Sequence, residues 1–129
     1  PELVIILAGI NDIAQNTGYI SIPETFTNII NMVEIANSHN IAPVLCSVLP
    51  ASKIVWKPEI ESADLVIELN EKLKGYCKEN NIVYVDYFSS MVGENKELRS
   101  DLTYDGVHPD KKGYLIMEKI LLETIQKKF

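Results

Sequence analysis

Two short motifs carry residues whose types and spacing suit proton transfer and oxyanion binding. The first, Asp105-Gly106-Val107-His108-Pro109, places an aspartate three residues before a histidine. The carboxylate of Asp105 can hold one ring N–H of His108 and stabilise the imidazolium, while the other ring nitrogen accepts a hydroxyl proton. The alternative interpretation is an ordinary surface turn, because Asp-Gly is a common turn pair and proline often begins a helix.

The second motif is Gly9-Ile10-Asn11-Asp12, which follows an apolar run. A backbone N–H at Gly9 and the side-chain amide of Asn11 could both donate to an oxyanion. Asp12 is expected to tie the loop down by accepting backbone N–H groups. The alternative is again a polar turn after a strand. Trp56, in a proline-flanked loop, either lines a pocket or anchors its loop, and Tyr104 is expected to border the site.

No serine stands in a convincing nucleophile context. None follows a Gly-Asp pair, and Ser21 and Ser62 are better explained as helix caps. The eight serines are Ser21, Ser38, Ser47, Ser52, Ser62, Ser89, Ser90 and Ser100. Because Pro1-Glu2 leads at once into a fully apolar run, we expect the nucleophile to lie upstream of Pro1.

The elements that must position these motifs alternate between strands and helices. Strands are expected at about Leu3–Ala8, Ala42–Leu49 and Ile82–Asp86, and helices from Ser21 to Ala36, from Ser62 to Glu79 and from Pro109 to Lys128. This order predicts one partial domain over residues 1–129, a three-layer α/β/α sandwich with a parallel sheet. All the polar candidates follow strands, so they should meet at the carboxyl edge of the sheet.

The composition limits the classes of partner. Hydrophobic residues make up 47% and charged residues 23%, and the net charge of −6 argues against nucleic acid or an anionic membrane surface. No apolar window is long enough to span a membrane. Cys46 and Cys77 are expected to be buried free thiols. No metal or cofactor is implied, and localisation is left open.

Taken together, the two motifs resemble the third and fifth sequence blocks of the SGNH subgroup of GDSL-type esterases and lipases. The resemblance covers the whole chain but only the latter part of the family's domain. It implies the flavodoxin-like SGNH hydrolase fold, with Asn11 as the side-chain oxyanion donor, His108 as the base and Asp105 as its partner. The family's Gly-Asp-Ser nucleophile block and its second block, which carries an oxyanion glycine, are absent from these residues.

The resemblance implies hydrolysis of small acyl esters, such as acetylated carbohydrate, or of lysophospholipid, through a serine that precedes Pro1; the chain alone is then inactive. Two alternatives stay open. One is a non-catalytic binding or assembly module, and the other is a metal-dependent hydrolase that uses Asp12, Asp105 and His108. A missing front strand would leave Leu3–Ala8 as a bare apolar edge. If the chain stands alone, we expect a homodimer or a domain swap through that edge, or marginal stability; as part of a longer polypeptide it needs no such dimer.

Overall fold

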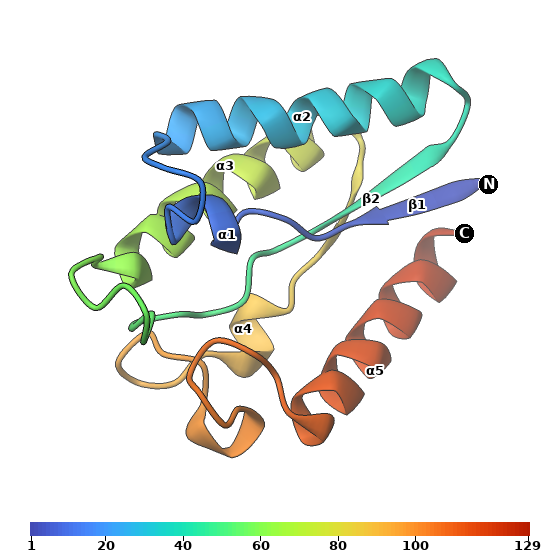
Figure 1. The fold of residues 1–129 in the computed structure, drawn as a ribbon. Helices are drawn as coiled ribbons and strands as arrows, with labels where there is room; N and C mark the ends of the chain where they lie inside the picture. The colour runs from blue at the N-terminus through green and yellow to red at the C-terminus, as the bar shows by residue number, and fades with distance from the viewer.

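The sheet at the centre of the molecule is parallel, as predicted. The computed structural model describes residues 1–129. Its three strands are β1 (Leu3–Ile6), β2 (Ala42–Cys46) and β3 (Val83–Val85), and they lie in the order β1-β2-β3. Figure 1 labels β1 and β2. The register places Ile5 opposite Val44, and Val44 opposite Val83.

All three strands are shorter than predicted, and β2 shows the physical reason. The prediction carried β2 to Leu49, but its ladder ends at Cys46. Beyond that point the buried side chain of Asn70 bonds the backbone of Val48: the N–H of Val48 donates to Asn70 Oδ1 (2.7 Å) and Asn70 Nδ2 donates to the carbonyl of Val48 (2.9 Å). A side-chain amide thus satisfies the backbone of Val48 where a neighbouring strand would otherwise do so.

Helices cover both faces of the sheet and make the three predicted layers. α2 (Ile22–Ser38) and α3 (Ser62–Asn80) lie on one face, and α5 (Lys111–Lys128) lies on the other (Figure 1). A core of 16 buried residues joins the sheet to α2 and α3. A second core, of eight buried residues, joins the sheet to α5. The shorter elements α1 (Ile10–Ile13), α4 (Phe88–Met91) and η1 (Ser100–Leu102) lie in the connections.

The two serines predicted as helix caps behave differently. Ser21 caps α2 in a capping box: its Oγ accepts from the N–H of Glu24 (3.2 Å), and the Glu24 carboxylate accepts from the N–H of Ser21 (3.1 Å). The prediction for Ser62 is wrong. Ser62 is the first residue inside α3, and its buried hydroxyl donates to the carbonyl of Ala51 (2.6 Å). Ser62 therefore ties the loop after β2 to α3.

The last helix begins later than predicted. We expected Pro109 in its first turn, but α5 starts at Lys111 with Asp110 at the N-cap. The carboxylate of Asp110 accepts from the N–H of Gly113 (2.9 Å), which satisfies a donor that the helix start leaves free. Pro109 precedes the cap and ends the loop that carries His108.

Both cysteines are buried and free, as predicted. Burial raises the pKa of the Cys46 thiol and of the Cys77 thiol to about 11. Because the thiolate is the reactive form, neither side chain is a nucleophile at neutral pH.

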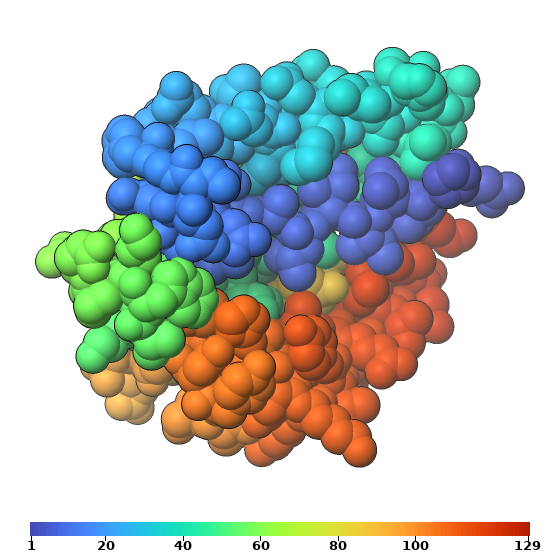
Figure 2. Space-filling model, viewed as in Figure 1, coloured from blue at the N-terminus to red at the C-terminus, as the bar shows by residue number.

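Strand β1 forms one edge of the sheet. Two of the apolar side chains in this segment are exposed, Ile5 by 43% and Leu7 by 45%. In the space-filling view the first residues of the chain, in dark blue, lie open at the surface above α5 (Figure 2). Pairing of this edge with a second copy stays a prediction. None of the helices has the length and apolar character that crossing a membrane requires.

Candidate active site

A cavity lies beyond the carboxyl ends of β1 and β2, and residues from three connections and from α5 line it. Its volume is about 160 Å³. The connections are those that follow β1 and β2 and the one that leads into α5, so the sheet edge that the sequence predicted does gather these segments. The lining is mostly apolar, and its polar side-chain groups come from Asn11, Trp56, His108 and Tyr114.

Asp105 binds His108 through both its ring and its backbone. Asp105 Oδ2 lies 2.6 Å from His108 Nδ1, while Asp105 Oδ1 accepts from the N–H of His108 (2.7 Å) and of Val107 (2.9 Å). The ionised carboxylate is only an acceptor, so Nδ1 carries the ring proton and Nε2 keeps its lone pair. The His108 side chain is 55% exposed, against 24% for Asp105. Asp105 therefore fixes the imidazole through Nδ1, while much of the ring stays accessible.

These hydrogen bonds also shift the pKa of Asp105. The backbone N–H of His108, followed by its ring and the N–H of Val107, lowers the pKa of the Asp105 carboxyl well below its usual range, against the opposing effect of burial. The carboxylate consequently stays charged at any pH at which His108 acts as a base. It is suited to stabilising an imidazolium and does not accept the proton itself.

Thr103 organises the turn, and sequence reasoning missed it. Its hydroxyl donates to the carbonyl of His108 (2.6 Å) and accepts from the N–H of Gly106 (3.0 Å). Gly106 has φ +84°, a conformation that side chains rarely adopt. The available signal was a threonine two residues before Asp105, because Ser and Thr hydroxyls often bond to backbone groups a few residues away. Thr103 thus ties together the backbone of the loop that carries Asp105 and His108.

Asn11 and Gly9, which both follow β1, contribute differently to the site. Asn11 is in the single turn of α1 and lines the cavity. Gly9 does not line it. Its φ is +131°, and a Cβ there would lie 2.8 Å from Leu69 Cδ2 and 3.0 Å from Val48 Cγ2. Backbone conformation and core packing thus account for the glycine, and a direct part in oxyanion binding stays a prediction.

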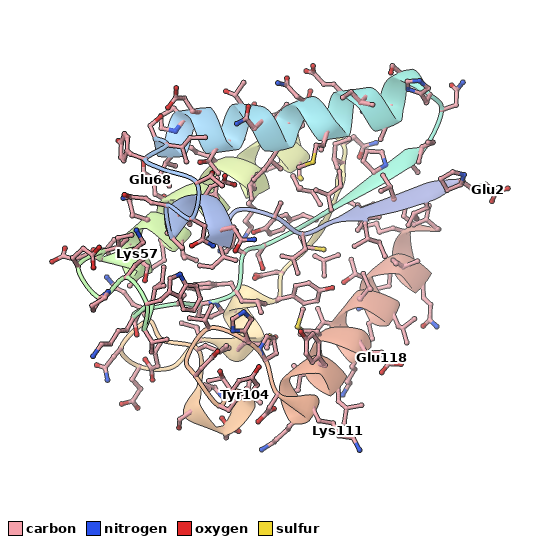
Figure 3. All side chains as sticks on the ribbon, viewed as in Figure 1. Glu2, Lys57, Glu68, Tyr104, Lys111 and Glu118 are labelled. Atoms are coloured by element: carbon pink, nitrogen blue, oxygen red, sulfur yellow. The ribbon has the colours of Figure 1, made fainter.

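Asp12 and Tyr104 do not take the places that we expected for them. The Asp12 carboxylate makes no hydrogen bond; its backbone oxygen accepts from the N–H of Gln15 (3.0 Å). No group of three or more His, Cys, Asp or Glu side chains is arranged to hold a metal ion, so Asp12 does not join Asp105 and His108 in a ligand set. Tyr104 is 77% exposed and outside the cavity lining; Figure 3 labels it on its loop.

With this geometry in place, the chain can be compared with known proteins. The model of the GDSL-like lipase/acylhydrolase family matches residues 1–116. The chain belongs to this family. A search of curated protein sequences found no match.

Solved structures of the same family superpose closely on the chain. A protein assigned as an acylhydrolase from Bacteroides fragilis is 45% identical with a TM-score of 0.95, and the match covers 99% of this chain and 62% of that one. A GDSL-like lipase from Bacteroides thetaiotaomicron is 44% identical with a TM-score of 0.95, covering 100% of this chain and 64% of that one. The chain therefore spans less than two thirds of either protein.

A more distant structure shares the fold alone. An acetylxylan esterase from Geobacillus stearothermophilus is 18% identical with a TM-score of 0.75, and the match covers 97% of this chain and 59% of that one. The SGNH-type α/β fold that the two motifs predicted is thus confirmed.

In this GDSL-family chain no serine lines the cavity beside His108. Ser47 follows β2 near that edge of the sheet, but it is fully buried and its hydroxyl accepts from the N–H of Phe88 (3.0 Å). Ser62 is equally buried. The described residues therefore present an oriented histidine and a side-chain amide to one cavity, without a hydroxyl nucleophile between them.

Proposed function

We propose that this chain forms the base and oxyanion side of a serine-dependent acyl-ester hydrolase. The observation that carries the proposal is the Asp105–His108 pair, whose histidine lines the same cavity as Asn11. An imidazole whose Nδ1–H is held by a carboxylate can act as a general base through Nε2. A nearby amide donor can stabilise the negative charge that develops on the substrate oxygen.

In the proposed reaction a serine hydroxyl supplied by residues that precede Pro1 attacks the ester carbonyl. His108 Nε2 takes the hydroxyl proton as the serine oxygen bonds to the carbonyl carbon, and Asn11 Nδ2 donates to the oxyanion of the tetrahedral intermediate. The imidazolium then returns the proton to the departing alcohol, which leaves an acyl-serine. Water, deprotonated by His108, attacks the acyl-serine, and the collapse of the second intermediate releases the acid and restores the serine.

The cavity favours a short acyl group as the substrate. Ligand pockets for drug-sized molecules occupy roughly 300–1,000 Å³, whereas the cavity formed by these residues is about 160 Å³. An acetyl group fits within the part of the cavity that these residues line, and none of its lining comes from a long apolar lid. We therefore propose small acyl esters, such as acetylated carbohydrate, in preference to lysophospholipid.

A serine-reactive fluorophosphonate tests the placement of the nucleophile. Intact-mass spectrometry of residues 1–129 should show no adduct, because the cavity holds no serine. The protein expressed with the residues encoded before Pro1 should gain one adduct, on a serine in that added segment. A single adduct on one of the eight serines of this chain would overturn the placement. No adduct on either protein would instead favour a binding module with the same fold.

A further inference from the structure

The amide of Asn11 has a defined orientation, and a neighbouring tryptophan determines it. The indole N–H of Trp56 is only a donor, and it donates to Asn16 Oδ1 at 3.1 Å. The other end of that amide, Asn16 Nδ2, donates to Asn11 Oδ1 at 3.0 Å. Because each amide has one accepting and one donating end, this sequence of bonds leaves Asn11 Nδ2 free to donate elsewhere.

The backbone around Asn16 is shaped to make this contact. The N–H of Asn16 donates to the backbone oxygen of Asn11 (3.1 Å), so a main-chain and a side-chain hydrogen bond join the two residues. Gln15, between α1 and Asn16, has φ 54°, a left-handed conformation that turns the chain back after the single helical turn. Asn16 therefore lies beside Asn11 by local folding, and Trp56 reaches it from the loop after β2.

Trp56 also contacts the base. Its ring stacks on the imidazole of His108, with centroids 6.0 Å apart and an interplanar angle of 26°. The side chain is 43% exposed, but its loop is anchored by Ile54, which is fully buried and whose carbonyl accepts from the N–H of Lys57 (2.9 Å). Figure 3 labels Lys57 on this loop. Trp56 therefore contacts both Asn16, which orients Asn11, and His108, which accepts the proton.

We propose that Asn16 and Trp56 are positioning residues, which hold the amide of Asn11 with its N–H₂ toward the cavity. The proposal rests on the proposed function for its effect on catalysis, but not for its geometry. Without the bridge, the Asn11 amide can rotate and present its carbonyl oxygen, which repels an oxyanion. The bridge thus selects the productive one of two nearly isosteric orientations.

Substituting Asn16 by aspartate or alanine separates orientation from packing. Asn16→Asp keeps the size and the bond from Trp56 but replaces the donor facing Asn11 by an acceptor. The Asn11 amide should then turn its Nδ2 to the carboxylate and its oxygen to the cavity, so kcat should fall by about 10²–10³-fold, as for loss of an oxyanion donor. Asn16→Ala should cost less, about 10-fold in kcat, with KM changed less than about twofold, because the amide becomes free but is not reversed. The opposite order, with alanine worse than aspartate, would overturn the proposal.

Two further variants control for the added charge and for the ring. In an Asn11→Ala background, Asn16→Asp should have little further effect; a full additional loss would mean that the carboxylate acts on the oxyanion directly, which overturns the proposal. Trp56→Phe keeps an aromatic ring over His108 but removes the N–H, so it should lower kcat about as much as Asn16→Ala. Asn28→Asp, on the exposed side of α2 with no side-chain hydrogen bond, adds the same charge away from the site and should leave kcat unchanged.

A spectroscopic test of the bridge needs no activity. Trp56 is the only tryptophan, so a ¹⁵N-edited NMR spectrum of this chain contains one indole N–H resonance. Loss of the hydrogen bond should move that resonance upfield in Asn16→Ala, whereas Asn16→Asp keeps an acceptor, now charged, and should not move it upfield. An unchanged resonance in Asn16→Ala would overturn the bridge whatever the enzyme does. If the resonance moves but the complete protein hydrolyses no ester, the proposed function fails and the bridge stands.

Discussion

Replacing Gly9 by alanine tests how tightly the core constrains the start of α1, which carries Asn11. The new Cβ would lie 2.8 Å from Leu69 Cδ2 and 3.0 Å from Val48 Cγ2. Leu69 is fully buried and Val48 is 2% exposed, so neither side chain has free space to move into. Overpacking of this kind costs about 1–3 kcal/mol. The φ of +131° adds conformational strain of about 1–3 kcal/mol for a residue with a side chain. The free energy of unfolding should therefore fall by about 2–6 kcal/mol, a large part of the usual 5–15 kcal/mol.

Two other glycines separate these contributions. Gly18 has φ +110°, and a Cβ added to it would have no atom within 4 Å, so Gly18→Ala should show the strain alone. Gly75 lies on the exposed side of α3, also with open space, and has no positive φ. Gly75→Ala should stabilise the chain by about 1 kcal/mol, because alanine favours helix over glycine by that amount.

Chemical denaturation followed by far-ultraviolet circular dichroism measures all three variants on this chain. The expected order of stability is Gly75→Ala, wild type, Gly18→Ala and then Gly9→Ala. If Gly9→Ala is no more destabilising than Gly18→Ala, the predicted clash with Leu69 and Val48 does not occur, and the packing argument for Gly9 is wrong.

Three other predictions concern the fold and the pair at the site. Asn70→Ala should lower the free energy of unfolding by about 2–5 kcal/mol, because it leaves the N–H and the carbonyl of Val48 buried without partners. If Asn80→Ala, at an exposed position, lowers the free energy of unfolding as much, this prediction is wrong. The pKa of Asp105 is lowered in the folded state, so its contribution to stability is complete above the ordinary carboxyl pKa near 3.8 and is lost as pH falls through the folded value. Asp105→Asn should therefore be less stable than wild type by about 1.5–3 kcal/mol at pH 7, and denaturation at pH 3 should show a smaller difference; a difference independent of pH would refute the linkage. The exposed edge at Ile5 should pair with a second copy of the chain. Light scattering should then give twice the chain mass of 14.5 kDa, and Ile5→Lys should restore the monomer. A monomeric wild-type chain would contradict this prediction.

Local patterns in the sequence were enough to predict the layers of the fold and the edge that holds the cavity. The apolar runs around Val44 and Val85 have the unbroken character of strands covered on both faces, and both residues are fully buried. Ser21 and Glu24 form their capping box within one helical turn, so three residues of spacing specify it. Asp105 and His108 likewise lie within a single turn, and their spacing already suggested contact.

Features that depend on distant contacts could not be predicted in the same way. Asn70 lies 22 residues from Val48 in sequence, and nothing in the helical pattern of α3 marks it as the partner of a strand end. Trp56 and Asn16 are 40 residues apart, and only the packing of two loops brings them together. The start of α5 was misplaced for a different reason: Pro109 and Asp110 are adjacent, both are common at helix starts, and the contact with Gly113 decides between them.

Steady-state hydrolysis of a short acyl ester tests the central claim most directly. The protein that includes the residues encoded before Pro1 should hydrolyse p-nitrophenyl acetate. His108→Ala should reduce kcat by at least about 10⁴-fold, and Asn11→Ala should reduce it by about 10²–10³-fold while the fold is retained. His39→Ala is the matched control, because His39 caps the far end of α2 and should leave kcat unchanged. If His108→Ala keeps wild-type kcat, the cavity is not the site of hydrolysis and the account is contradicted.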